Sequence, residues 1–160
     1  MSIELLINQS VPTERLLLNK PATPPRPDYV WMDGEGKMVG ISRKQAGEMM
    51  ALDAVENQLL EEMDGVDYTG LQIEGWISPT VNGFCQTWVQ RANPNIMFRG
   101  KEFGLSYTAL MAKLARLSDL GIVLLPQTPD WQGTACSLVA MYNESVKPEA
   151  EHRTFKRLIK

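Results

Sequence analysis

Two residues suited to metal-dependent phosphodiester hydrolysis, Asp28 and Lys44, stand at the ends of two neighbouring predicted strands. A divalent cation that activates water needs hard oxygen ligands, and an aspartate carboxylate supplies them. A nearby ammonium group can neutralise the charge that develops on the phosphate. If the fold brings Asp28 and Lys44 together, their chemistry is therefore that of a phosphodiester hydrolase.

A β-hairpin is expected to bring these two residues together. Residues 28–33 and 37–42 read as short strands rich in apolar and aromatic side chains, and an Asp-Gly turn over residues 33–36 joins them. In such a hairpin Asp28 lies at the start of the first strand, and Lys44 lies beside it at the end of the second strand. The candidate site is therefore expected at one end of a sheet.

The order of motifs resembles the nuclease domain of the XPF-type structure-specific endonucleases, a branch of the PD-(D/E)XK superfamily. That family carries Gly-Asp, a variable gap, Glu-Arg-Lys, and an aspartate four residues after the lysine. The matching residues here are Pro27-Asp28, Ser42-Arg43-Lys44 and Glu48. The resemblance covers roughly residues 1–146 and is strongest over residues 28–75.

The chain departs from the family pattern at two places. Ser42 stands where the family has glutamate, and Asn8 with Gln9 stand where its first strand usually ends in an acidic residue. A neutral hydroxyl is a weak metal ligand, so a carboxylate from elsewhere would be needed. Some restriction enzymes of the superfamily resemble this arrangement, with serine on the strand and a glutamate moved onto the following helix.

Glu48 and Glu56 lie on such a predicted helix, and Glu48 is the preferred replacement. The alternative is that both are ordinary solvent-facing glutamates, and that Glu48 is merely favourable near the positive N-terminus of the helix.

The resemblance implies a metal-dependent endonuclease that acts on branched or irregular DNA. Mg²⁺ or Mn²⁺ would be held by Asp28 and Glu48, with Glu56 as a further candidate ligand. Lys44 would orient the attacking water or neutralise the phosphate, and Arg43 would position the backbone. Family members commonly work as dimers, so a homodimer or a paired nuclease-like subunit is expected.

Two other hypotheses remain. One is a catalytically inactive member of the same fold that binds DNA or a partner protein, which Ser42 and Asn8 would favour. The other is a small-molecule enzyme on an unrelated α/β fold, which would predict a glycine loop that cradles phosphate. Gly34 and Gly36 do not form one, because no helix follows their turn.

Basic residues gather toward the second half of the chain, although the formal net charge is −3. Arg99 and Lys101 flank a glycine in what reads as a flexible basic loop, while Arg153 and Lys156 belong to a basic C-terminal tail. These four are the candidate DNA contacts, because phosphate binding needs locally positive surface. The alternative for each is a solvated surface residue.

Length and composition favour one intracellular domain. With 160 residues and 44% hydrophobic content, the chain can form a single core, over residues 1–146, followed by a tail over residues 147–160. Two cysteines, no leader-like start and no apolar run of roughly 20 residues predict a reduced, cytoplasmic protein outside the membrane. One histidine, His152, leaves carboxylate and lysine chemistry as the material for a site.

The predicted fold is α/β, with a mixed central sheet of about five strands flanked by helices, as in restriction endonucleases. Strands are expected at residues 3–7 and 122–125, and helices over residues 13–18, 45–63, 106–120 and 130–146.

On the helix predicted over residues 45–63, three glutamates are expected to face away from the core or sideways: Glu56, Glu61 and Glu62. Between residues 76 and 104 the turn signals predict a hairpin excursion. Its four aromatic residues would either stack on unpaired bases or form a small core of their own: Trp76, Trp88, Phe98 and Phe103.

Overall fold

The structure, a computed structural model, describes residues 16–18, 27–92 and 95–147. The larger of its two sheets has the strand order β1-β2-β3-β4-β8, and the smaller has the order β5-β6-β7. The strands of the larger sheet are β1 (Leu16–Leu18), β2 (Tyr29–Met32), β3 (Met38–Gln45), β4 (Tyr68–Glu74) and β8 (Ile122–Leu124). Those of the smaller sheet are β5 (Trp76–Pro79), β6 (Phe84–Ala92) and β7 (Asn95–Ser106). The helices are η1 (Ala46–Met50), α2 (Leu52–Met63), α3 (Tyr107–Asp119) and α4 (Trp131–Ser145).

The larger sheet is mixed. Strands β1, β2 and β3 pair antiparallel, whereas β3 pairs parallel with β4 and β4 pairs parallel with β8. Parallel neighbours need a long crossover, which α2 supplies between β3 and β4 and which the smaller sheet and α3 supply between β4 and β8. The predicted fold class, an α/β domain with a mixed central sheet of about five strands flanked by helices, is confirmed.

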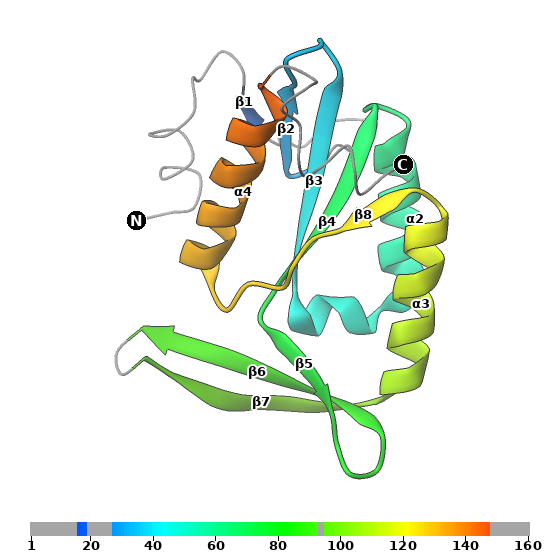
Figure 1. The fold of residues 1–160 in the computed structure, drawn as a ribbon. Helices are drawn as coiled ribbons and strands as arrows, with labels where there is room; N and C mark the ends of the chain where they lie inside the picture. Colours follow the sequence, from blue (N-terminus) through cyan, green and yellow to red (C-terminus); the bar gives the residue numbers. More distant parts are fainter. Residues whose placement is uncertain (1–15, 19–26, 93–94, 148–160) are drawn as a thin grey trace.

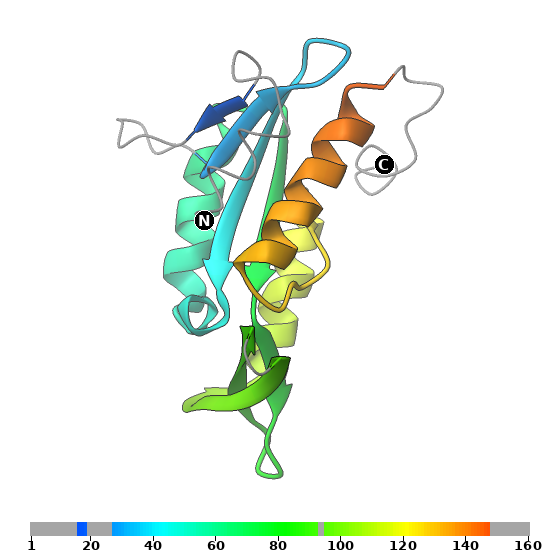
Figure 2. The same ribbon diagram turned by 90° about the vertical axis from the view of Figure 1, so that its left-hand side faces the viewer.

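Helices cover both faces of the larger sheet (Figures 1 and 2). Helix α4 packs on one face, where Leu138 joins a core that contains Trp31 and Ile41. On the opposite face, α2 and α3 pack with Leu59 and Leu110 in the second core. Because successive side chains of a strand point to opposite faces, each residue of β3 reaches only one of these two helical layers.

The turn between β2 and β3 forms as the sequence predicts. The Asp33 carboxylate accepts hydrogen bonds from the backbone N–H groups of Glu35 and Lys37, both at 2.8 Å. Gly36 has φ 80°, a conformation that glycine adopts without a steric penalty. The hairpin that was expected to position the site is therefore confirmed.

The predicted elements of the last third of the chain are also confirmed. Ser106 caps α3 by accepting a hydrogen bond from the N–H of Ala109, and Asp130 caps α4 through Gly133. Strand β8 is buried between these helices, as its continuous apolar run predicts.

The helix predicted over residues 13–18 is wrong for residues 16–18, which form strand β1 against β2. A helix that short has few internal hydrogen bonds, while the edge of β2 offers a backbone partner to each residue. The strand predicted at residues 3–7 and the tail over residues 148–160 lie outside the described residues.

The smaller sheet continues from β4 beyond the end of the larger one (Figure 1). Gly75 makes the junction with φ 97°, and a side chain there would meet Ala46 at 3.2 Å. The predicted hairpin excursion is confirmed. The flexible loop expected at residues 99–101 is wrong, because these residues lie within β7 and pair with β6.

Within the described residues, no helix is long and apolar enough to cross a membrane. Both cysteines carry free thiols. Cys85 is buried in the second core, while Cys136 is exposed on α4.

Candidate active site

Asp28 lies directly before β2, and its carboxylate is held against the end of β3. Its Oδ2 atom accepts a hydrogen bond from the backbone N–H of Arg43 at 2.7 Å. The hairpin register, in which Tyr29 pairs with Ile41, places Asp28 beside the segment that carries Ser42 and Lys44. The structure therefore brings Asp28 to the strand end that the sequence predicts.

A buried glutamate from α2 occupies the space next to Ser42. The Ser42 hydroxyl donates a hydrogen bond to Oε2 of Glu62, and the two residues are only 0% and 1% exposed. Glu62 was expected to face away from the core, and this prediction is wrong. Helix α2 packs on β3 so that Glu62 reaches the sheet, where Ser42 is too small to keep the carboxyl group out.

Gln58 connects Glu62 to the lysine. The ammonium group of Lys44 donates to Gln58 Oε1 at 2.6 Å, and Gln58 Nε2 donates to Glu62 Oε1 at 2.9 Å. Gln58 and Glu62 are four residues apart in α2, so they share one face of the helix. We call the resulting group the Lys44–Glu62 cluster; it consists of Asp28, Ser42, Lys44, Gln58 and Glu62.

The electrostatics of this cluster centre on Glu62. Burial raises the pKa of Glu62, and the negative charge of Asp28 adds to that rise. The hydrogen bonds from Ser42 and Gln58, together with the charge of Lys44, act in the opposite direction. Two carboxyl groups thus repel each other in a site that holds one lysine.

Arg43 points to the opposite face of β3, toward α4. Its guanidinium group makes two hydrogen bonds to the Glu74 carboxylate, at 3.2 Å from Nε and 2.7 Å from a terminal nitrogen. Burial opposes the charge on this group, but the hydrogen bond and the charge of Glu74 outweigh it, so the pKa of Arg43 is raised. Arg43 therefore fixes the strand end and stands apart from the Lys44–Glu62 cluster.

Glu48 and Glu56 are engaged away from this cluster. Glu48 lies in η1, where its carboxylate accepts the backbone N–H of Gln45 at 2.6 Å as part of a capping box. Glu56 forms ion pairs with Lys113 and Arg116 of α3, and the hydrogen bonds from these two residues lower its pKa. In this structure both glutamates are therefore engaged in contacts outside the Lys44–Glu62 cluster.

The candidate DNA-binding residues Arg99 and Lys101 are exposed on β7 of the smaller sheet. The Arg99 guanidinium lies 5.8 Å from the centre of the Trp88 ring, and the Lys101 ammonium lies 5.2 Å from that of Phe103. These cations are held over aromatic rings on a strand, so their positions are fixed more closely than in a loop. Arg153 and Lys156 lie outside the described residues.

The aromatic residues of the excursion have different surroundings. Phe103 packs against the second core of the domain and not in a separate core of the excursion. Trp76 is 38% exposed, and Trp88 donates a hydrogen bond from its indole nitrogen to Ser78 at 2.7 Å. The stacking of these residues on unpaired bases stays a prediction.

Sequence reasoning missed Glu62 because a charged residue on a helix is more often exposed than buried. Two signals pointed to it. Ser42 called for a relocated carboxylate, and Gln58 stood four residues before Glu62, on the same helical face.

Asp28 and Glu62 are the oxygen donors that the Lys44–Glu62 cluster offers to a divalent cation. Among the residues that the structure describes, no group of three His, Cys, Asp or Glu side chains could hold a metal ion. Mg²⁺ is nevertheless commonly bound by one or two carboxylates, with waters and substrate phosphates as the remaining ligands. Asp28 and Glu62 are the two carboxylates of the cluster. Burial is the main cause of the raised pKa of Glu62, and a divalent cation would offset the smaller contribution that comes from the charge of Asp28.

The solved structures that resemble this chain include two of XPF from Aeropyrum pernix. The first is 23% identical, with a TM-score of 0.46, and covers 77% of this chain and 51% of its own. The second, a complex with DNA, is 20% identical, with a TM-score of 0.45, and covers 77% and 50%. This chain thus spans about half the length of each, and a likeness at this level carries no argument about function. No family model and no curated protein matches the chain.

Proposed function

We propose that this protein is a metal-dependent endonuclease of PD-(D/E)XK type that cleaves DNA, and that Glu62 replaces the carboxylate missing from its strand motif. The hydrogen bond between Ser42 and Glu62 is the observation that carries this proposal. Through this contact the carboxyl group of Glu62 lies beside Ser42, where the family motif has a glutamate. It is also part of the cluster that contains Lys44 and Asp28.

In the proposed reaction, water attacks a phosphodiester and one phosphorus–oxygen bond breaks. A bound Mg²⁺ or Mn²⁺ would lower the pKa of that water and offset charge on the phosphate. Asp28 and Glu62 would hold the cation. Lys44 would face the phosphate with its ammonium group, and Gln58 would hold that group in place through the 2.6 Å hydrogen bond.

The surrounding residues contribute position. The Arg43 backbone N–H orients the Asp28 carboxylate, while the Arg43 side chain ties β3 to β4 through Glu74. Arg99 and Lys101 supply positive charge on the smaller sheet for the DNA backbone. Branched or irregular DNA is the proposed substrate, and a homodimer or a paired nuclease-like subunit is the proposed assembly.

A second candidate function is a catalytically inactive nuclease-like subunit that binds DNA or a partner protein. The observation in its favour is that both oxygens of Glu62 already accept hydrogen bonds, from Ser42 and Gln58. A carboxyl group with a raised pKa can remain protonated in such a network and need no cation.

Mn²⁺ binding, measured by calorimetry, separates these candidates when it is combined with cleavage of a branched DNA. The matched variant is Asp28→Asn, which keeps an acceptor for the Arg43 N–H and removes the charge. We expect the parent protein to bind Mn²⁺ and to nick DNA, and Asp28→Asn to lose both. A parent protein that binds DNA but neither binds Mn²⁺ nor cleaves would support the inactive subunit.

A further inference from the structure

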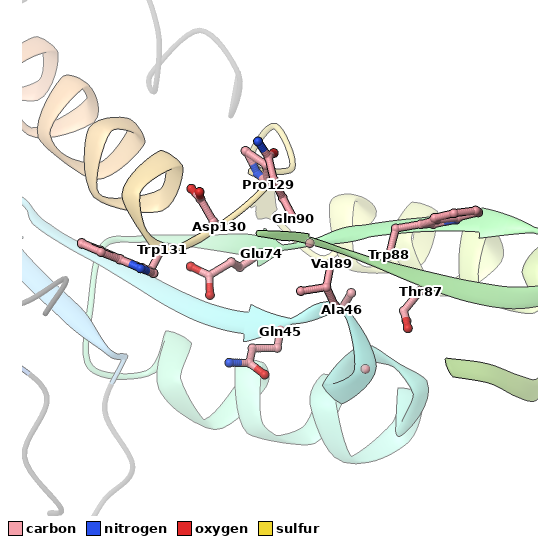
Figure 3. Close-up of a pocket in the computed structure, with 12 residues that line it drawn as sticks. Gln45, Ala46, Glu74, Thr87, Trp88, Val89, Gln90, Pro129, Asp130 and Trp131 are labelled. Atoms are coloured by element: carbon pink, nitrogen blue, oxygen red, sulfur yellow. The ribbon is translucent and has the colours of Figure 1, made fainter. Parts of the chain in front are cut away.

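A pocket of about 250 Å³ lies where β3 and β4 end, next to the start of α4 (Figure 3). It is smaller than the roughly 300 to 1,000 Å³ that hold drug-sized ligands. Its lining comes from β3, η1, β4, β6 and the start of α4 with the residues before it. The polar and aromatic residues among the lining are Gln45, Glu74, Thr87, Trp88, Gln90, Asp130 and Trp131. Its size thus suits one flat ring system with hydrogen-bonding edges.

Strand β3 connects this pocket to the Lys44–Glu62 cluster. Lys44 points toward α2, whereas the next residue, Gln45, lines the pocket. Arg43 also links the two sites, since its backbone N–H binds Asp28 and its guanidinium group binds Glu74 in the pocket wall. If a DNA phosphate lies at Lys44, the pocket lies at the same end of β3, on the opposite face of the strand. The base of an adjacent nucleotide is therefore the part of the DNA that lies nearest to the pocket.

The charges of the lining disfavour a phosphate group. No lysine or arginine lines the pocket among the described residues. The charge of Glu74 is offset by Arg43, and Asp130 accepts the N–H of Gly133 through Oδ1 at 2.8 Å. Asp130 makes no ion pair within the described part of the chain, and its second carboxylate oxygen can accept a hydrogen bond from an N–H group of a ligand.

The lining therefore suits the neutral, nitrogen-rich edge of a nucleobase. The indole ring of Trp131 provides a stacking surface for a base. The ring of Trp88 extends away from Glu74 and Asp130 (Figure 3) and is held by Ser78 and Arg99. The amides of Gln45 and Gln90 can pair with base edges, and an aspartate accepts hydrogen bonds from an exocyclic amino group. Enzymes that draw a base out of the helix recognise it in this way, through its edge and by stacking.

We propose that this pocket binds one unpaired nucleobase that carries an exocyclic amino group, beside the phosphate at Lys44. This inference rests on the proposed function, because it takes DNA as the substrate. Adenine, cytosine and guanine have such an amino group, and thymine does not. The proposal therefore narrows the substrate to DNA with an extruded nucleotide and predicts discrimination against thymine.

The test is binding in EDTA, followed by fluorescence anisotropy, to duplexes with a single bulged nucleotide. The bulge is cytosine, adenine, thymine or an abasic analogue. We expect bulged cytosine and adenine to bind about tenfold more tightly than bulged thymine, because thymine lacks the amino group. Bulged thymine should in turn bind about tenfold more tightly than the abasic duplex, because it keeps the stacking interaction. EDTA removes cleavage from the measurement, so the result does not depend on the metal chemistry.

Two variants locate the effect. Asp130→Asn keeps the helix cap, because asparagine caps as well as aspartate, and it is expected to remove the preference for amino-bearing bases. Trp131→Ala is expected to lower affinity for every bulged base about tenfold and to leave the abasic duplex unchanged. The matched control, Arg99→Gln, should weaken all duplexes equally.

The outcomes are distinct. Equal affinity for all four duplexes, or a preference that survives Asp130→Asn, overturns the pocket assignment and leaves the proposed nuclease standing. A preference for amino-bearing bases in a protein that never cleaves DNA supports the pocket and overturns the nuclease chemistry. A protein that binds no DNA overturns both.

Discussion

Ser42 of β3 donates a hydrogen bond to Glu62 of α2, although 20 residues separate the two in the sequence. The contact joins a buried hydroxyl to a buried carboxyl group next to the second hydrophobic core. A buried carboxyl group of this kind costs free energy unless it is paired or protonated, so a function that uses it explains its presence best.

Glu62→Gln should abolish metal-dependent cleavage. The amide keeps the shape of the side chain and its contact with Ser42, but it removes the charge that would hold the cation. We expect a loss of at least about 100-fold in single-turnover nicking of a branched DNA. Glu48→Gln serves as the matched control, since Glu48 belongs to a capping box. If Glu48→Gln stops cleavage and Glu62→Gln does not, the relocated carboxylate is Glu48.

The pH dependence of stability should also identify Glu62. Burial raises its pKa in the folded state, so the folded chain holds this proton more tightly than the unfolded chain. The contribution of protonated Glu62 to the free energy of unfolding is therefore fully present below the ordinary glutamate pKa of about 4.3. It is lost as the pH rises through the raised folded-state pKa.

Urea unfolding without metal, from about pH 4 to about pH 8, measures this effect in the parent protein and in Glu62→Gln. The free energy of unfolding of Glu62→Gln should rise relative to that of the parent as the pH increases. Other titrating groups cancel in this difference. A difference that stays constant with pH would contradict the raised pKa.

Exchanging the two positions should recover activity. Ser42→Glu alone adds a third carboxyl group to a buried site, and we expect it to lower both stability and cleavage. Combined with Glu62→Ser, it returns a glutamate to the strand, as in the family motif. The double variant should cleave within about tenfold of the parent, as expected for coupled neighbours. Additive losses in a double-mutant cycle would show that the two positions do not share one role.

Lys44→Met should separate chemistry from binding. The methionine keeps most of the volume of the side chain. It removes the ammonium group that donates a hydrogen bond to Gln58. Cleavage should fall by at least about 100-fold, while DNA affinity in EDTA changes by less than about tenfold. Gln58→Met should lower cleavage less, because Gln58 only positions the lysine. An equal loss of affinity and rate in Lys44→Met would assign Lys44 to DNA binding.

Neutralising Arg99 and Lys101 together should reduce the salt dependence of DNA binding. If both contact phosphates, the slope of log affinity against log salt concentration falls by up to ~2. The control is the pair Lys113→Gln and Arg116→Gln, whose side chains face Glu56. An unchanged slope in the Arg99 and Lys101 variant would place the DNA on another surface.

Local chemistry determined much of the scaffold from the sequence alone. The Asp-Gly turn, the capping residues Ser106 and Asp130, and the apolar run of β8 each act through neighbours in the chain. The sequence also predicts that Asp28 lies beside the end of β3, because the turn of a hairpin fixes the register of its two strands. Residues 16–18 were misjudged, since their strand depends on pairing with β2.

Only the tertiary structure decided which glutamate meets Ser42. Helical periodicity predicts a single helix that carries Glu48, Glu56 and Glu62, whereas the fold places Glu48 in η1 and the other two in α2. Periodicity also says nothing of how a helix lies across the sheet. In the fold, Glu56 meets the cations of α3, while Glu62 meets the serine of β3. Contacts between elements depend on packing angle and side-chain volume, and these are properties of the assembled core.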